Sequence, residues 1–201
     1  MPERTREEIL QAAIAEFSDK GLGGARVDVI ARRAGANKRM IYHYFRSKEA
    51  LFLAVLERTY DDIRRDEAAL KLEKLDPVSG MRRLVEFSFG YFTDHPHFIR
   101  LLNSENLHGA RHLKKSQRIR EMNSPLIEMI RRILLRGEKE GAFRAHIDPV
   151  QLYISIAALG YFYFANIHTL STVFGRDLSS PRLVQERRRH AVDMVLGYIR
   201  R

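Results

Sequence analysis

The chain has no cysteine among its 201 residues, so neither a disulfide framework nor a thiolate metal site can form. The first ten residues, MPERTREEIL, carry charges where a signal peptide needs an apolar run, and we therefore expect a cytoplasmic protein. Convincing strand alternation, hairpin motifs, internal repeats and low-complexity segments are also missing. Because strand and hairpin patterns are missing, the sequence predicts a helical protein.

The motifs of common catalytic sites are likewise missing: there is no Gly-rich phosphate loop, nucleophile elbow or HExxH sequence. Glu105, His108 and His112 could present three metal ligands on one helix face. However, Gly109 within this set weakens the helix, and the sequence places no second histidine pair near it. We predict neither an enzyme nor a bound metal or cofactor.

Charge is strongly unbalanced, with a formal net charge of +10 and 45% hydrophobic residues. The length and hydrophobic content suit one ordinary core with a small satellite domain. Excess positive charge favours an anionic partner, which could be nucleic acid or a membrane surface.

Residues 26–48, RVDVIARRAGANKRMIYHYFRSK, carry seven basic residues and one acid. Apolar residues at helical spacing (Val27, Ile30, Ala31) lead to a turn at Gly35, and Asn37 can cap a second helix. This layout is typical of a helix-turn-helix motif.

The second helix separates two kinds of side chain. If Ile41 and Phe45 point into the core, the other faces expose basic and aromatic groups that can meet phosphates and base edges. These groups are Lys38, Arg39, Tyr42 and His43. A basic run alone is usually a solvated face, but the aromatics and the capped start favour nucleic-acid binding here.

Residues 9–55 resemble the N-terminal domain of the TetR/AcrR family of bacterial transcriptional regulators. The resemblance rests on Ala12-Ala13, Phe17, Gly21, Ile30-Ala31, Ala34-Gly35, the run from Tyr42 to Phe45, and Ser47-Lys48-Glu49. The chain departs from the family pattern at Ala25-Arg26, where a hydroxyl is usual, and at Ala36-Asn37, where Asn still serves as a cap. The resemblance implies a DNA-binding domain at 1–47 and a ligand-binding and dimerisation domain at 48–201. The predicted DNA-binding residues are Arg26, Asn37, Lys38, Arg39, Tyr42, His43, Tyr44 and Lys48.

Helix boundaries are predicted by caps, prolines and glycines. Starts are expected at Thr5 with Glu8 as a capping box, Ser47, Asp76-Pro77, Ser124-Pro125, Asp148-Pro149 and Ser180-Pro181, with a further boundary at Asp94-His95-Pro96. Ends are expected at Gly21, Gly137, Gly141 and Gly175. The prediction is an all-α fold of about nine helices, with three in the DNA-binding domain.

The stretch from Val150 to Gly175 contains no Asp, Glu, Lys or Arg and is long enough to cross a bilayer. Its polar residues, the stop at Gly175 and the polar helix that follows favour a body helix that also packs on a second subunit. By the resemblance, residues 148–172 and 181–199 form a four-helix bundle in a homodimer. The predicted interface residues are Ile156, Leu159, Phe162, Tyr163, Val192, Val195 and Leu196.

Aromatic residues are dense in 87–112 and 153–168, as expected for a mostly apolar pocket with a few polar groups. The predicted ligand-binding residues are Phe87, Tyr91, Phe98, Leu102, Glu105, Asn106, Arg111, Tyr161, Phe164 and His168. The run 98–113 resembles that of family members that sense pyrimidines or other nitrogen heterocycles, which implies an aromatic or nitrogen-heterocyclic effector.

The sequence thus predicts a homodimeric repressor that binds a palindromic double-stranded DNA operator and is released by a small molecule. Two alternatives stay open. One is an architectural or nonspecific nucleic-acid-binding protein, and the other is a membrane-associated protein.

Overall fold

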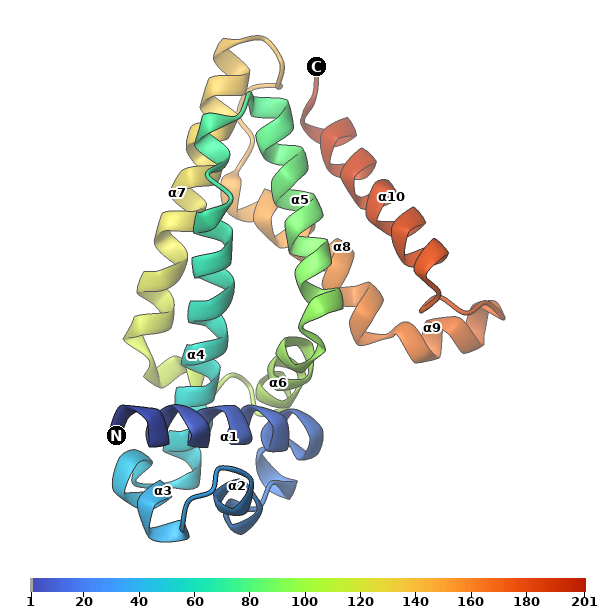
Figure 1. Cartoon of the computed structure of the whole chain (residues 1–201). Coiled ribbons are helices and arrows are strands. Elements are labelled where there is room, and N and C mark those ends of the chain that lie inside the picture. The colour runs from blue at the N-terminus through green and yellow to red at the C-terminus, as the bar shows by residue number, and fades with distance from the viewer. Residues whose placement is uncertain (1) are drawn as a thin grey trace. The chain divides into compact units, whose positions relative to one another are not determined.

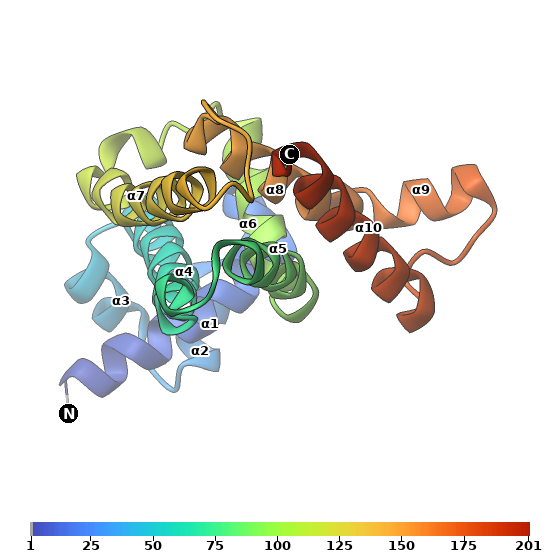
Figure 2. The same cartoon turned by 90° about the horizontal axis from the view of Figure 1, so that it is seen from above.

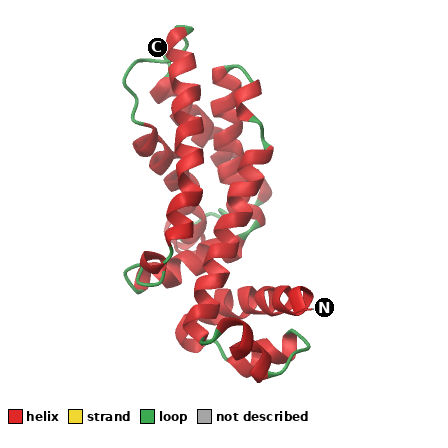
Figure 3. Cartoon of the chain, turned by 90° about the vertical axis from the view of Figure 1, so that its left-hand side faces the viewer, coloured by secondary structure: helices red, strands yellow, loops and turns green. Residues whose placement is uncertain are grey.

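A computed structural model describes residues 2–201, and they are helical with no strand among them (Figures 1 and 3). The α-helices are α1 (Pro2–Gly24), α2 (Val27–Arg33), α3 (Lys38–Phe45), α4 (Lys48–Ala69), α5 (Pro77–Asp94), α6 (Pro96–Leu107), α7 (Gln117–Lys139), α8 (Pro149–Ala165), α9 (Ile167–Phe174) and α10 (Pro181–Ile199). Two short 3-10 helices are η1 (Leu72–Lys74) and η2 (Leu113–Lys115). The all-α prediction is confirmed.

The described residues form ten α-helices, one more than predicted, because the helix expected over 148–172 is broken at Asn166. No single described helix is long and apolar enough to span a membrane. Helices α8 and α9 pass that test of length and composition only as a pair, and they are bent by 71° where they meet.

Four predicted caps are confirmed by hydrogen bonds from backbone N–H groups to the capping side chains. Asn37 accepts from Met40, Ser47 from Ala50, Asp76 from Ser79, and Asp148 from Val150 and Gln151. These side chains satisfy donors that a helix start otherwise leaves without partners. The helices that carry the candidate sites therefore begin where the sequence places them.

Other predicted boundaries are wrong. Helix α1 begins at Pro2, so Thr5 lies inside the helix and cannot be its cap. Helix α7 begins at Gln117 rather than at Ser124-Pro125, because the Oγ of Ser116 accepts a hydrogen bond from the Ile119 N–H and starts the helix earlier. Gly137 lies within α7, where a Cβ would come 2.1 Å from the buried ring of Phe143. That glycine marks a close packing contact rather than a helix end.

Contacts divide the chain into two compact units. The head unit comprises Met1–Asp62 with His97–Arg120, and the body unit comprises Ile63–Pro96 with Glu121–Arg201. The head unit thus contains α6 and most of α4 in addition to the three N-terminal helices. The sequence, by contrast, places a boundary between residues 47 and 48.

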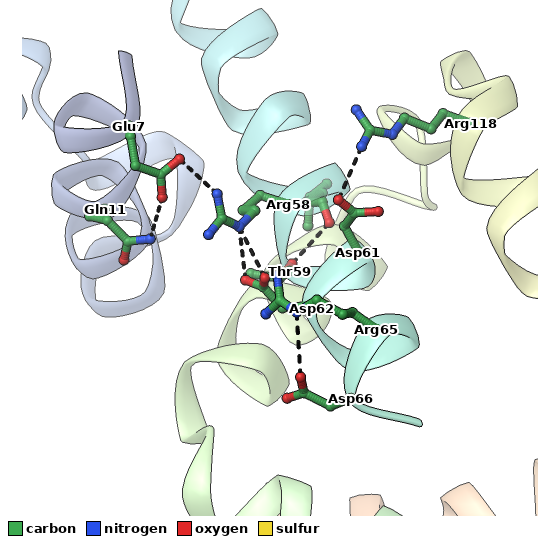
Figure 4. A network of polar contacts seen from close by, with 10 residues as sticks. Glu7, Gln11, Arg58, Thr59, Asp61, Asp62, Arg65, Asp66 and Arg118 are labelled. Carbon is green, nitrogen blue, oxygen red and sulfur yellow. Dashed lines mark hydrogen bonds and ion pairs between the residues drawn. The ribbon is translucent and has the colours of Figure 1, made fainter. Parts of the chain in front are cut away.

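The core of the head unit is built on α1 and α4. The rings of Phe17 and Phe52 meet edge to face at 5.1 Å, and both side chains are fully buried. Arg58 of α4 joins the two helices at their polar edge: its Nη1 donates to Glu7 at 2.7 Å and its Nε to Asp62 at 3.0 Å (Figure 4). A hydrogen bond from Gln11 and the charge of Arg58 hold the pKa of Glu7 below its ordinary value.

In the body unit, α5 packs against both α8 and α10 (Figures 1 and 2). Its core contains fully buried side chains of α5, α7 and α10 together with Phe143. The chain end is held by a bridge between Phe143 and Arg200 and by the Arg144 guanidinium, which lies 3.6 Å from the centre of the Tyr198 ring.

Candidate functional site

Helices α2 and α3 form a helix-turn-helix in the head unit (Figure 1). The turn passes through Gly35, whose φ of 59° favours glycine, and the Ala36 N–H donates to the Ala31 carbonyl at 2.9 Å. Buried Glu16 of α1 holds α2 in place: its Oε1 accepts from the Arg26 N–H at 3.3 Å and its Oε2 lies 3.2 Å from Arg33 Nη1.

Helix α3 has one buried face, as predicted. Ile41 and Phe45 are 0% and 5% exposed, whereas Lys38, Arg39, Tyr42 and His43 are all exposed. The Lys38 Nζ lies 5.9 Å from the centre of the Tyr42 ring, within reach of a cation–π contact. A capped, anchored helix therefore presents donors and aromatic rings to solvent, and these groups can contact phosphates and base edges.

The other predicted DNA-binding residues are more engaged with the protein. Arg26 makes two hydrogen bonds to Asp28, at 3.2 and 3.1 Å, and these hold the pKa of Asp28 below its ordinary value. Lys48 Nζ donates to the Gly23 carbonyl at 3.4 Å, and the oxygen of Asn37 is used as the helix cap. Tyr44 is half-buried, with its ring 5.3 Å from that of His43.

The predicted ligand-binding residues are divided between the two units. Phe98, Leu102, Glu105, Asn106 and Arg111 belong to the head unit, and Phe87, Tyr91, Tyr161, Phe164 and His168 belong to the body unit. Of the second set, Phe87 and Tyr91 line an open cleft of about 370 Å³ together with charged residues of α4, α5 and α10. Phe164 packs on Phe89 with ring centres 5.0 Å apart, and His168 is exposed on α9.

Glu105 is a structural residue of the head unit rather than a free ligand-binding group. It is 0% exposed, and its carboxylate accepts three hydrogen bonds: from the N–H groups of His112 and Leu113 and from Nδ1 of His112 at 2.7 Å. Burial alone would raise the pKa of Glu105, but these hydrogen bonds outweigh it and hold the pKa below its ordinary value.

The metal-ligand hypothesis for Glu105, His108 and His112 required one continuous helix. Helix α6 ends at Leu107, and the rings of His108 and His112 lie 6.3 Å apart. Within the described part of the chain, no group of three or more His, Asp or Glu side chains is placed to hold a metal ion.

Sequence reasoning missed a buried polar group in the body unit. Arg64 and Glu67 lie on the last turns of α4, and Arg64 Nη2 donates to the hydroxyl of Tyr153 on α8 at 2.9 Å. Burial raises the pKa of Glu67 to about 7, with the charge of Arg64 acting in the opposite direction. The spacing of Arg64 and Glu67 is visible in the sequence, but the contact with Tyr153 spans 89 positions.

Glu67 should make the stability of the fold depend on pH. Because its folded pKa is raised from 4.5 to about 7, its contribution favours folding below pH 4.5 and is lost as the pH rises through 7. From pH 5 to pH 8, we expect the free energy of unfolding to fall by about 2–3 kcal/mol more in the wild type than in Glu67→Gln. Urea denaturation across this range measures the difference, and a constant difference would contradict the prediction.

The predicted dimer residues lie mostly in the core of the single chain. Ile156, Tyr163, Val192, Val195 and Leu196 are each 6% exposed or less, since they pack against α5 and its neighbours. Within the single chain these five side chains are core residues, and of the five only Val195 also lines the groove between α8 and α10; their place in an intersubunit surface stays a prediction. Leu159 is half-buried, and Phe162 is 58% exposed.

Helices α8 and α10 nevertheless carry several exposed apolar side chains. An open groove of about 500 Å³ is lined by Leu152, Ser155, Ala158, Leu159, Phe162, Arg187, Met194, Val195 and Tyr198. Ile154, Phe162, Met194 and Tyr198 are each more than half exposed. Large apolar side chains gathered in this way are typical of a protein interaction surface.

Comparison with known proteins agrees with this architecture. Residues 9–55 match the family described as "Bacterial regulatory proteins, tetR family", and residues 77–195 match "Tetracyclin repressor-like, C-terminal domain". The chain is 40% identical to the HTH-type transcriptional repressor NicS of Pseudomonas putida over 99% of its length and 94% of that protein. It is 31% identical to the HTH-type transcriptional repressor SCO4008 of Streptomyces coelicolor over 79% of its length and 77% of that protein.

The fold is similar to the crystal structure of SCO4942 from Streptomyces coelicolor. The TM-score is 0.71 and the sequence identity 27%, with 97% of this chain and 98% of that chain covered. With family matches across both the helix-turn-helix and most of the remaining helices, the chain belongs to the TetR family of DNA-binding bacterial transcriptional regulators.

Proposed function

We propose that the protein is a transcriptional repressor that binds a palindromic operator as a homodimer and is released by a small molecule. The observation that carries the proposal is the exposed face of α3, held outward by the Asn37 cap and by the buried Ile41 and Phe45. Two relatives that match most of the chain are named as repressors. A DNA operator as the partner supports a cytoplasmic location.

Within a DNA-binding domain proposed at residues 1–47, the exposed side chains take different roles. Lys38 and Arg39 are the first two residues of α3 and are exposed, which suits contacts to base edges in the major groove. We assign Tyr42, His43 and Lys48 to the phosphate backbone. Arg26, Asn37 and Tyr44 support these contacts, since part of each side chain is already engaged within the head unit.

The homodimer is proposed to form through the groove face of α8 and α10. Phe162, Met194 and Tyr198 supply exposed apolar area there, and a two-fold interface buries the same patch on both subunits. Two helix-turn-helix motifs held at a fixed separation then require two half-sites at a matching spacing. The operator should therefore be palindromic.

Release is proposed to follow from an aromatic or nitrogen-heterocyclic effector bound in the body unit. Phe87 and Tyr91 offer one ring-lined wall at the cleft described above. An effector can shift the protein only if it binds the DNA-incompetent arrangement more tightly than the DNA-competent one. A thermal-shift screen of aromatic acids, pyrimidines and purines tests for such a ligand, because selective binding to the folded protein raises its stability.

The roles of Arg39 and Lys48 can be separated on DNA. After an operator is obtained by selection from random-sequence DNA, we expect Arg39→Ala to lose about 1–3 kcal/mol of discrimination between operator and random DNA. Lys48→Ala should weaken binding to both DNAs about equally and reduce the salt dependence, because it removes one phosphate contact. Fluorescence anisotropy at several salt concentrations measures both effects.

Lys114→Ala serves as the control, since it removes an exposed charge from η2 of the same unit without touching α3. Selection that yields no preferred sequence, or equal losses on operator and random DNA from both variants, would favour a nonspecific nucleic-acid-binding protein instead.

A further inference from the structure

Two oppositely charged side chains are buried together near the C-terminal end of α4. The side chains of Arg64 and Glu67 are 9% and 3% exposed, and Arg64 Nε lies 3.0 Å from Glu67 Oε2. Both residues belong to the body unit, as does Tyr153, the hydrogen-bond partner of Arg64. Burial of charged groups is costly unless their hydrogen-bonding capacity is satisfied.

Most of the hydrogen-bonding groups of Arg64 and Glu67 have no partner within the part of the chain that the structure describes. Among the described residues, no hydrogen-bond partner is found for Nε and Nη1 of Arg64 or for either carboxylate oxygen of Glu67. The close contact between the two side chains lacks the alignment of a hydrogen bond. The buried hydroxyl of Ser88 on α5 is also without a partner among these residues. Buried polar atoms of this kind are rare in folded proteins and call for a missing partner.

The chemistry of the missing partner follows from the atoms that need it. Arg64 offers N–H donors and requires an acceptor, whereas the Glu67 carboxylate accepts and requires a donor. When Glu67 is ionised, its charge and that of Arg64 balance, so a charged ligand would leave an uncompensated charge in the interior. A neutral molecule with a carbonyl next to an N–H gives Arg64 an acceptor and Glu67 a donor, and it adds no charge. A cyclic amide holds the carbonyl and the N–H on one edge.

We propose that Arg64 and Glu67, supported by Tyr153, form the polar end of the effector site, and that this site recognises a neutral cyclic amide. The proposal rests on the proposed function and narrows its effector class. Tyr153 holds the guanidinium in place through the 2.9 Å hydrogen bond, and its ring lies 5.5 Å from the centre of that guanidinium. Arg64 then donates to the ligand carbonyl and Glu67 accepts from the ligand N–H.

The test uses 2-pyridone as the probe, with N-methyl-2-pyridone, which has no N–H donor, and benzoate, which is anionic, as matched ligands. Binding of each to the full-length protein is measured by ligand-observed NMR titration. We expect 2-pyridone to bind about 10- to 100-fold more tightly than either matched ligand, because each lost hydrogen bond to a charged group is worth that factor. Equal binding of the three, tighter binding of benzoate, or no binding of 2-pyridone would overturn the assignment.

Variants locate the site. Arg64→Met should abolish 2-pyridone binding, and Glu67→Gln should remove most of the preference over the N-methyl compound, because the glutamine amide can both donate and accept. Arg65→Met is the control, since Arg65 is an exposed neighbour on the same helix with a side chain 64% exposed. If Arg64→Met does not fold, the test is the preference of Glu67→Gln for 2-pyridone over N-methyl-2-pyridone. Unchanged preference in that variant would overturn the proposal.

Operator binding by the wild type and these variants separates the cyclic-amide site from the proposed repressor function. If 2-pyridone fails to bind while the wild type still selects and binds a palindromic operator, the cyclic-amide site is wrong and the repressor stands. If no specific DNA is bound, the proposed function itself fails.

Discussion

We expect Phe162→Asp to separate the proposed dimer into monomers and to lower its affinity for a palindromic operator by about 10²- to 10⁴-fold. Phe162 is 58% exposed and lines the α8–α10 groove, so a carboxylate there would be desolvated in a two-fold interface formed through this groove. The loss on DNA follows because a linked second half-site raises affinity by about this factor. Sedimentation analysis and operator titration measure the two effects.

The control substitution is Leu107→Asp, because Leu107 is an 86% exposed apolar residue of α6, outside the groove. This variant should sediment and bind the operator as the wild type does. Half-site DNA provides a second check, since Phe162→Asp should bind it about as well as the wild type. A Phe162→Asp protein that remains a dimer would place the interface on another surface.

The second large effect is expected from Glu105→Ala, which should lower the free energy of unfolding by about 3–5 kcal/mol. The substitution leaves two backbone N–H groups and the Nδ1 of buried His112 without their acceptor. Glu105→Gln should cost less, because its amide oxygen can still accept from the two N–H groups. Urea denaturation followed by circular dichroism measures both values.

Glu128→Ala removes an acid from an exposed pair with Arg131 and serves as the control for this series. Exposed pairs of this kind contribute little, so its effect should stay within about 0.5 kcal/mol. A similarly small effect of Glu105→Ala would show that the carboxylate is dispensable for holding the segment after α6.

The local features of the helix-turn-helix could be predicted from the sequence because they depend on neighbours within a few residues. A cap at Asn37 needs only the next three residues, and burial of Ile41 and Phe45 follows from helical spacing. The same reasoning failed at Ser124-Pro125, where Ser116 starts the helix eight residues earlier. The sequence offers both Ser116 and Ser124 as caps, and it does not show that Ser116 is the buried one.

The body unit was harder to predict because its important contacts join distant segments. The apolar periodicity includes Ile156, Val192 and Leu196, but it does not distinguish a core position from a subunit interface. In the structure all three side chains lie in the core of the single chain. Likewise, nothing local identifies Tyr153 as the partner of Arg64. Side chains that complete a site across the fold become visible only with the structure.

Helix α4 belongs to both units, with residues 48–62 in the head unit and 63–69 in the body unit. It contains no glycine or proline between Lys48 and Ala69, the residues at which helices most often kink. A ligand held by Arg64 and Glu67 would therefore contact the same continuous helix whose N-terminal residues belong to the head unit. Thermodynamic reciprocity then requires operator DNA to weaken effector binding by the same factor by which the effector weakens operator binding.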